Sequence, residues 1–214
     1  KGLFEPVLVG PEARIRAAAD AAEVDLDGIA IEQALHSHAA AARAVELVVS
    51  GEVAVLVKGS LHTDELLGAI VAPGSLLKTE RRISHVFALD VPAYGKPLIV
   101  TDAAINIQPT LDHKRDICQN AVDLLRTLGV DKPRVAVLAA VETVNAKMPA
   151  TLDAAALTVM AARGQIAGAL VDGPLAFDNA ISIAAARTKG IVSDVAGEAD
   201  ILLVPDLEAG NMLA

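Results

Sequence analysis

Short apolar runs alternate with amphipathic segments along the chain. The apolar runs have the length and composition of buried strands, and they occupy residues 6–9, 28–31, 53–57, 83–89, 98–100, 134–139, 166–171 and 201–204. Most of the segments between them carry apolar residues at helical spacing, which predicts helices at 11–22, 38–49, 63–72, 111–128, 151–163 and 178–189. Strands that alternate with helices are typical of parallel sheets built from right-handed crossovers. The pattern therefore predicts an α/β fold with a largely parallel sheet.

One connection departs from this alternation. The apolar runs at 83–89 and 98–100 are joined only by residues 90–97, a segment too short to hold a crossover helix. It predicts either an antiparallel hairpin or a crossing between subdomains. We place a domain boundary near Val91, which gives a first α/β subdomain at 1–91 and a second at 92–214.

The composition of the chain argues against a nucleic-acid-binding protein and against a disulfide-rich one. The chain has 214 residues and a formal net charge of −9, with 53% apolar residues but only 2% aromatic ones. A chain of that length can bury a sizeable core, and an apolar composition with so few aromatic residues predicts closely packed aliphatic layers. A net negative chain with few aromatics is a poor nucleic-acid binder. The lone cysteine, Cys118, allows no disulfide framework, and its place within a predicted helix favours a core residue.

The sequence carries no pattern typical of a membrane span or a signal peptide. No apolar run approaches the roughly 18 residues that a membrane span needs, and Lys1 to Glu5 lack the pattern of a signal peptide. The sequence therefore predicts a cytoplasmic location without a membrane partner. A strand-like run follows close on Lys1 and a helix-like pattern is just beginning at Asn211, so we expect a fragment of a longer protein.

Polar side chains follow most of the predicted strands. In open α/β sheets, ligands bind beyond the carboxyl ends of the strands. For any single residue, a turn or helix cap is the alternative interpretation, but the set as a whole favours a substrate-binding edge. Its members are Lys58, Gly59, Ser60, Asp102, Asn106, Glu142, Asn145, Asp172, Asp178 and Asn211.

The segment Lys58-Gly59-Ser60 is the strongest local candidate for binding an anion. A glycine after a buried strand lets backbone N–H groups approach an anion, and the helix predicted at 63–72 would present its positive N-terminus. Thr63 could line the same site or serve only as a helix cap. Neither the Walker spacing nor a GxGxxG motif occurs in the chain, which argues against a nucleotide-phosphate loop of either type.

A second candidate for binding an anion is formed by the neighbouring arginines Arg81 and Arg82, together with Ser84. Arg82 and Ser84 lie two residues apart at a strand entrance, which places them on one side of an extended chain. A guanidinium group suits bidentate contact with phosphate. The alternative is that Arg81 and Arg82 are both simply solvated. His36 and His38 are interpreted as polar residues at a helix entrance, and no metal site is predicted.

Taken together, these motifs resemble the phosphate acetyl/butyryltransferase family, particularly the butyryltransferase-like branch found fused to a hydratase-like domain. The resemblance runs through essentially the whole chain. It rests on Lys58-Gly59-Ser60-Leu61-His62-Thr63, Arg82-Ile83-Ser84-His85-Val86-Phe87, Val100-Thr101-Asp102-Ala103-Ala104-Ile105-Asn106, Ala140-Val141-Glu142-Thr143-Val144-Asn145, Val171-Asp172-Gly173-Pro174-Leu175-Ala176-Phe177-Asp178 and Pro205-Asp206-Leu207-Glu208-Ala209-Gly210-Asn211.

The resemblance implies two α/β subdomains of the isocitrate-dehydrogenase-like type with a cleft between them, usually paired into homodimers. It implies reversible transfer of a short acyl group between CoA and phosphate, by direct attack of the CoA thiolate on an acyl phosphate. CoA is then a substrate, with no permanently bound cofactor. Arg82 and Ser84 match the phosphate-side motif, and Ser60 and Thr63 match the polar loop facing the same cleft. The family's catalytic Ser-Arg pair and aspartate base lie beyond Ala214, so the catalytic residues of this chain remain unassigned.

Two rival functions stay open at this level. A metal- and NAD-dependent decarboxylating dehydrogenase shares the fold in outline and could use Asp172, Asp178 and Asp206 for a divalent ion. A non-catalytic fragment that dimerises or binds CoA is the other. Acetyl and butyryl substrates are not distinguished either, because one methylene changes binding by only about 1–3 kcal/mol.

Overall fold

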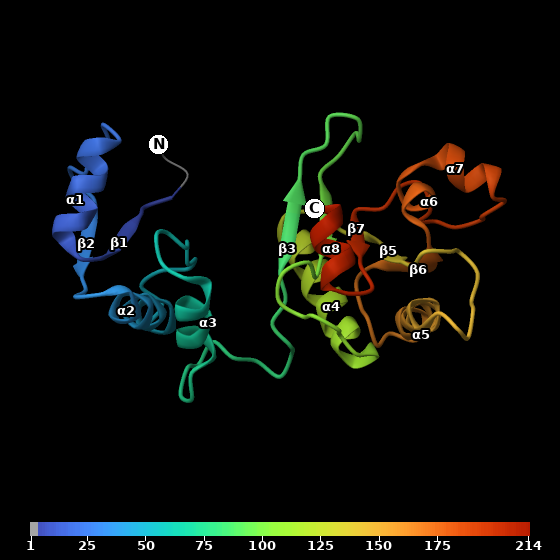
Figure 1. Cartoon of the computed structure of the whole chain (residues 1–214), viewed down its shortest axis with the longest axis horizontal. Coiled ribbons are helices and arrows are strands. Elements are labelled where there is room, and N and C mark those ends of the chain that lie inside the picture. The colour runs from blue at the N-terminus through green and yellow to red at the C-terminus, as the bar shows by residue number, and fades with distance from the viewer. Residues whose placement is uncertain (1–3) are drawn as a thin grey trace. The chain divides into compact units, whose positions relative to one another are not determined.

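The computed structural model describes residues 4–214 and divides into two compact units, residues 1–80 and 81–214 (Figure 1). Lys1, Gly2 and Leu3, part of the segment compared with a signal peptide, lie outside the described residues. The division falls between Glu80 and Arg81 rather than near Val91. The reason is that β3 (Val86–Leu89) pairs antiparallel with β4 (Leu98–Thr101) and so belongs to the sheet of the second unit. The predicted hairpin is confirmed.

The first unit is built on a two-stranded parallel sheet. Strand β1 (Val7–Gly10) pairs with β2 (Ala30–Gln33), and α1 (Glu12–Ala21) connects them. Helices α2 (Ser37–Val49) and α3 (Thr63–Val71) pack against one another, and α2 also contacts β1. Helix α2 buries Ala41, Val45 and Leu47; Ala41 and Val45 share one face at a spacing of four residues, whereas Leu47 is buried on another side.

The strand predicted at 53–57 is wrong. This segment forms no regular element, and Val55 and Val57 are 74% and 86% exposed. A strand is stable only when a neighbour completes its hydrogen bonds. Within residues 4–80 the only paired strands are β1 and β2, so the apolar composition of 53–57 has no ladder to join.

The second unit contains a five-stranded sheet in the order β3-β4-β7-β5-β6. Its other strands are β5 (Arg134–Leu138), β6 (Leu170–Leu175) and β7 (Ile201–Leu203). Every neighbouring pair except β3 and β4 is parallel. The predicted α/β class with a largely parallel sheet is confirmed.

Two hydrophobic cores lie on opposite faces of this sheet. Successive side chains of a strand point to opposite faces, so each strand contributes to both cores. In β7, Ile201 and Leu203 join the core formed with α4 and α5, whereas Leu202 faces the other core. Strands buried on both faces read as unbroken apolar runs, which is why sequence pattern located β4, β5 and β7 well.

Five helices cover the second unit: α4 (Leu111–Thr127), α5 (Pro149–Ala162), α6 (Phe177–Ile181), α7 (Ile183–Thr188) and α8 (Leu207–Leu213). The helix predicted at 178–189 is divided in two, because Ser182 leaves the helical conformation and caps α7 through the N–H of Ala185. Across residues 4–214, no helix is both long and apolar enough to cross a membrane.

The predicted end of the strand before Asp172 is also wrong. Strand β6 runs to Leu175, so Asp172, Gly173 and Pro174 lie inside it. From its sequence context, Asp172-Gly173-Pro174, Gly173 is expected to be a turn residue. In the structure it permits close packing instead, because a Cβ there would lie 2.7 Å from the carbonyl oxygen of Val137.

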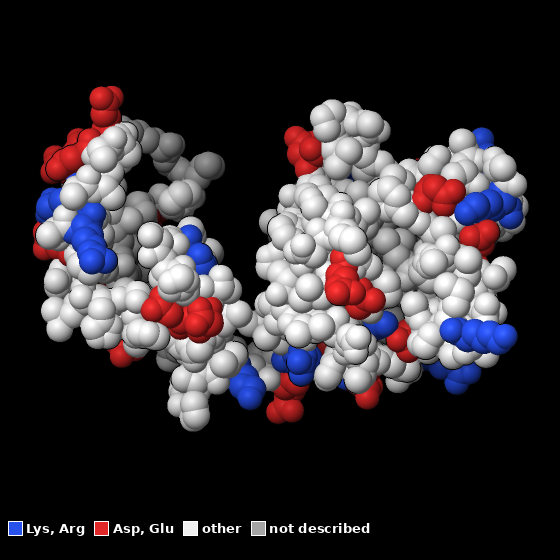
Figure 2. Space-filling model, in the orientation of Figure 1, with Lys and Arg blue, Asp and Glu red and all other residues white. Residues whose placement is uncertain are grey.

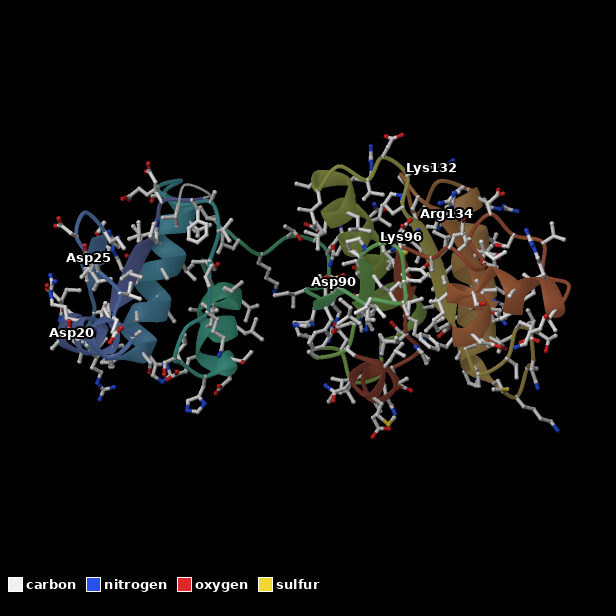
Figure 3. The ribbon with its side chains drawn as sticks, turned by 90° about the horizontal axis from the view of Figure 1, so that it is seen from above. Asp20, Asp25, Asp90, Lys96, Lys132 and Arg134 are labelled. Carbon is white, nitrogen blue, oxygen red and sulfur yellow. The ribbon has the colours of Figure 1, made fainter. Side chains whose placement is uncertain are left out.

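A cluster of contacts around Asp200 joins the amino ends of three strands. The Lys96 ammonium lies 2.5 Å from one Asp200 carboxylate oxygen, and the Arg134 backbone N–H donates to the other at 2.7 Å. The Tyr94 hydroxyl donates to the carbonyl of Ala199. Figure 3 labels Lys96 and Arg134 near one another in the second unit. These contacts tie the β3–β4 hairpin to the starts of β5 and β7.

Cys118 is expected to be unreactive in the folded protein. It is fully buried in α4, and burial raises the pKa of its thiol to about 12. The thiolate is the reactive species, so little of it exists near neutral pH. A disulfide reagent at pH 8 should react with this thiol only after urea is added. Reaction of the native chain at the rate of a free thiol would contradict this prediction.

Candidate functional site

A pocket of about 550 Å³ opens on the first unit. Its lining comes from three segments: Pro11 and Arg14 at the start of α1, residues 35–37 at the entrance to α2, and residues 58–62 with Glu65 around the start of α3. The pocket therefore contains three of the residues that the sequence nominates, Lys58, Gly59 and Ser60. Thr63, also nominated, is the first residue of α3 and follows the lining segment directly.

Glu65 is the one carboxylate in this lining, and it is already engaged. It accepts hydrogen bonds from the Ser37 hydroxyl at 2.6 Å and from the His62 N–H at 3.0 Å. The His38 imidazole lies 3.3 Å away. The Ser37 hydroxyl, followed by the His62 N–H, holds the pKa of the Glu65 carboxyl below its usual value. Glu65 thus fixes the α2 and α3 entrances to each other.

Two cations in the pocket lack acidic partners. Within residues 4–214, neither Arg14 nor Lys58 forms an ion pair, and no hydrogen bond of either side chain is seen. The face drawn in Figure 2 shows acidic and basic side chains interspersed over both units, so any attraction for anions is local rather than global. Arg14 was not nominated by sequence analysis, because a single arginine on an exposed helix carries no pattern.

In the second unit, Arg82 is the free end of a chain of hydrogen bonds. Its Nε donates to the side-chain oxygen of Asn106, and the Asn106 amide nitrogen donates to the carboxylate of Asp102 and to the carbonyl of Ile83. The two terminal nitrogens of Arg82 have no partner among the described residues. One nitrogen of the guanidinium, Nε, is therefore held in place by Asn106, and the two terminal nitrogens are free to donate to a ligand.

Asp102 organises the turn that follows β4. It is only 2% exposed and accepts from the backbone N–H groups of Ala104, Ile105 and Asn106 as well as from the Asn106 side chain. A buried carboxylate is tolerated only when its oxygens are satisfied in this way. Asp102 and Asn106 thus position Arg82 rather than facing solvent themselves.

Helix α4 anchors the same arginine from its other side. The Arg82 backbone N–H donates to Asp116, and Asn120 donates to both the Arg82 carbonyl and the Ser84 hydroxyl. Burial alone would raise the pKa of Asp116, but the Arg82 N–H and the Arg115 guanidinium outweigh it and hold that pKa below its usual value. The structure brings Arg82, Ser84, Asp102 and Asn106 together, although the boundary predicted near Val91 assigned them to different subdomains.

Arg81 has a different role from its neighbour. Its guanidinium lies 2.7 Å from Asp123 and also donates to Asn120, both on α4. Arg81 therefore fastens the chain to the helix, whereas Arg82 presents free donors. The sequence does not distinguish the two arginines, because their roles depend on which side of the chain α4 lies.

A second charged cluster joins the loop after β5 to helix α6 and to the end of α7. The Lys189 ammonium lies 3.3 Å from the carboxylates of both Glu142 and Asp178. Burial would lower the pKa of Lys189, but hydrogen bonds to Asp178 and Glu142 raise it above its usual value. Glu142 and Asp178 were predicted to converge and do so. Lys189 was missed, since it ends α7 and follows no strand.

The remaining nominated residues have local partners. The backbone and side chain of Asn145 close a turn with Thr151 and Lys147. Asn211 donates to the carbonyl of Ala103, which links α8 to the turn after β4. Asp172 accepts from the N–H of Gly173 within β6.

The aspartates required by the dehydrogenase alternative, Asp172, Asp178 and Asp206, do not form a ligand set. In the part of the chain that the structure describes, no group of three or more His, Cys, Asp or Glu side chains is arranged to hold a metal ion.

Comparison with known proteins identifies the family. A family model described as phosphate acetyl/butaryl transferase matches residues 37–213. The chain belongs to this family. The match spans both units and contains every binding-site residue that the sequence nominates, whereas Arg14 of the pocket lining lies outside it.

Two relatives of the phosphate acetyl/butaryl transferase family show the range of similarity. The phosphate acetyltransferase of Rickettsia prowazekii is 59% identical over 213 residues, covering 99% of this chain and 61% of the relative. The phosphate butyryltransferase of Clostridium acetobutylicum is 40% identical, covering 99% of this chain and 70% of the relative. The chain therefore spans about three fifths of the length of the Rickettsia protein. The expected likeness to the butyryltransferase branch is real, but here the acetyl name accompanies the higher identity.

A solved member of the family has the same fold. The branched-chain phosphotransacylase from Enterococcus faecalis superposes with a TM-score of 0.83 at 31% identity, covering 98% of this chain and 82% of that one. The two α/β units described above are thus the architecture of a phosphotransacylase.

Proposed function

We propose that this protein transfers a short acyl group, acetyl or butyryl, between CoA and inorganic phosphate. Family membership supports the reaction class, since relatives are named phosphate acetyltransferase and phosphate butyryltransferase. The structural observation that best supports the proposal is the geometry of the Arg82 guanidinium. Its guanidinium is oriented through Asn106 and Asp102, and two of its nitrogens are open to a ligand.

The proposed acyl transfer requires a positively charged group near the departing phosphate. The CoA thiolate attacks the carbonyl carbon of the acyl phosphate, a C–S bond forms, and the C–O bond to phosphate breaks with that electron pair leaving on the phosphate. Negative charge collects on the departing phosphate oxygens. Oriented donors in a site that excludes part of the water stabilise such charge most effectively. We assign this role to the open nitrogens of Arg82, with Ser84 beside it, and assign Asp102 and Asn106 as positioning residues.

Orientation of the two substrates supplies much of the remaining rate enhancement. We propose that the other nominated residues contribute to binding: Lys58, Gly59, Ser60 and Thr63 on the first unit, and Glu142, Asn145, Asp172, Asp178 and Asn211 on the second. A thiol with a reference pKa of about 8.5 needs only modest help to ionise. CoA acts as a substrate, and we propose no permanently bound cofactor.

The cellular setting follows from the resemblance on which the proposal also rests. We propose a cytoplasmic homodimer, and fusion to a hydratase-like domain in the intact protein. Molar mass in solution, measured by light scattering, tests the dimer directly.

Arg82→Ala tests the proposed site. In the longest natural form that contains this chain, we expect thioester formation from CoA and acetyl phosphate to continue, with the KM for inorganic phosphate in the reverse reaction raised at least about tenfold, as loss of a charge-assisted hydrogen bond predicts. Arg187→Ala is a matched control, because Arg187 lies on α7 and forms no ion pair among the described residues. An unchanged phosphate KM in Arg82→Ala contradicts the assignment. Failure to form thioester with any short acyl phosphate contradicts the function.

A further inference from the structure

The first-unit pocket is larger than the phosphate group that the reaction transfers. Its volume of about 550 Å³ falls within the range of about 300–1,000 Å³ that small-molecule sites occupy. The open donors of Arg82 belong to the second unit. The proposed reaction uses two anionic substrates, acyl phosphate and CoA, and the two units carry one cationic site each.

The lining has two chemical parts. Arg14 from α1 and Lys58 from the segment before α3 supply positive charge from separate parts of the chain, and neither is neutralised within residues 4–214. Glu65 offsets only part of this charge: the lining holds two cations against one carboxylate, and Ser37 and His62 hold that carboxylate at the α2 and α3 entrances. Gly59, without a side chain, leaves the backbone beside Lys58 accessible to a ligand oxygen.

The rest of the wall combines the hydroxyls of Ser37 and Ser60 with apolar and aromatic side chains. Leu35 and Leu61 contribute aliphatic groups, and His36 and His62 contribute imidazole rings, a side-chain type on which a purine ring could stack. A ligand that matches both parts carries phosphate groups at one end and a flat heterocycle near them. Inorganic phosphate and acetyl phosphate satisfy only the cationic part.

We infer that this pocket binds the phosphorylated nucleotide end of CoA, with Arg14 and Lys58 contacting its phosphate oxygens. The inference rests on the proposed function, which makes CoA a substrate. It assigns Arg14 as a binding residue and gives the two units different ligands: the nucleotide of CoA on the first and the transferable phosphate on the second.

Binding measurements test this inference without requiring turnover. Isothermal titration of the 214-residue chain with CoA, 3′-dephospho-CoA, pantetheine, inorganic phosphate and acetyl phosphate resolves which chemical group is recognised. We expect Arg14→Gln and Lys58→Gln each to weaken CoA binding at least about tenfold, with pantetheine binding unaffected. Both side chains are exposed, so neither change should disturb the fold, and circular dichroism checks this.

Matched variants separate a specific contact from a general loss of charge. Arg16→Gln removes a cation from the same helix, but Arg16 pairs with Glu12 and is not in the pocket lining. Lys78→Gln removes a lysine of the first unit outside the pocket. Both should bind CoA as the unaltered chain does.

Three results overturn the inference. The first is CoA binding that is unchanged in Arg14→Gln and Lys58→Gln, and this leaves the proposed function intact because thioester formation is measured separately. The second is binding of inorganic phosphate or acetyl phosphate that depends on Arg14 and Lys58, which would assign the transferable phosphate to this pocket. The third is absence of CoA binding to the unaltered chain.

Discussion

Asp102→Asn is expected to lower the free energy of unfolding of the second unit by at least about 3 kcal/mol, because hydrogen bonds to a charged group contribute about 1.5–3 kcal/mol each. The carboxylate accepts four hydrogen bonds, three from backbone N–H groups and one from Asn106. An asparagine side chain keeps one oxygen and directs an NH₂ group at donors. Some of those buried donors then lose their acceptor.

The same change should weaken phosphate binding. Asn106, released from Asp102, no longer fixes the Nε of Arg82, although Arg82 itself is unaltered. Urea unfolding followed by circular dichroism measures the stability, and titration with inorganic phosphate measures the affinity. A merely structural role would lower stability and leave the phosphate affinity of the folded fraction unchanged.

Asp206→Asn is the matched control. Asp206 also follows a strand, β7, but its side chain makes one hydrogen bond, to the N–H of Ala209 at the start of α8. Asparagine caps helices about as well as aspartate. We therefore expect almost no change in stability, and a loss comparable to that of Asp102→Asn would show that any carboxylate at this edge matters equally.

Asp153→Ala is expected to destabilise the second unit by about 3 kcal/mol, since removing one partner of a buried ion pair leaves the other charge uncompensated. Lys114 on α4 is only 5% exposed, and its ammonium lies 2.7 Å from the Asp153 carboxylate on α5. The pair joins two helices that cover the same face of the sheet.

A second substitution distinguishes charge from packing. Buried ion pairs can often be replaced by apolar residues at little cost, so adding Lys114→Met to Asp153→Ala should restore most of the lost stability. Asp112→Ala removes one of the two carboxylates that pair with Arg115, in an exposed contact, and should cost no more than about 1 kcal/mol. If Asp153→Ala unfolds at the same urea concentration as the unaltered chain, the pair contributes nothing measurable.

Sequence pattern located those elements whose stability depends on burial. Strands β4, β5 and β7 are unbroken apolar runs because both faces of the sheet are covered, and α4 follows the helical period. The pattern failed where an element depends on a neighbour. Residues 53–57 have the composition of a strand but no partner. Strand β6 continues through Gly173 because it pairs with β5 as far as Leu175, and the glycine permits the close approach to the carbonyl of Val137.

The residues of the candidate site likewise fall into those that local sequence pattern predicts and those that it does not. Arg82, Ser84, Asp102 and Asn106 were recognisable because each follows or precedes a strand end, and strand ends meet at one edge. Lys189 and Arg14 were not. Lys189 is brought to Glu142 by the packing of α7, and Arg14 becomes significant only because the residues around Lys58 form a pocket against α1. Distant contacts of this kind leave no local trace in the sequence.

The position of β7 at the centre of the sheet has a consequence for the order in which the protein is made. Strands β4 and β5 are consecutive in the chain but are not neighbours, because β7 lies between them. Tyr94 and Lys96 likewise find their partners at Ala199 and Asp200. During translation, the first unit has all its strands once residue 80 has left the ribosome, whereas the sheet of the second unit must wait for Leu203. Until then, the inner edges of β4 and β5 stay unpaired, which makes the nascent second unit the part of the chain most dependent on protection from aggregation.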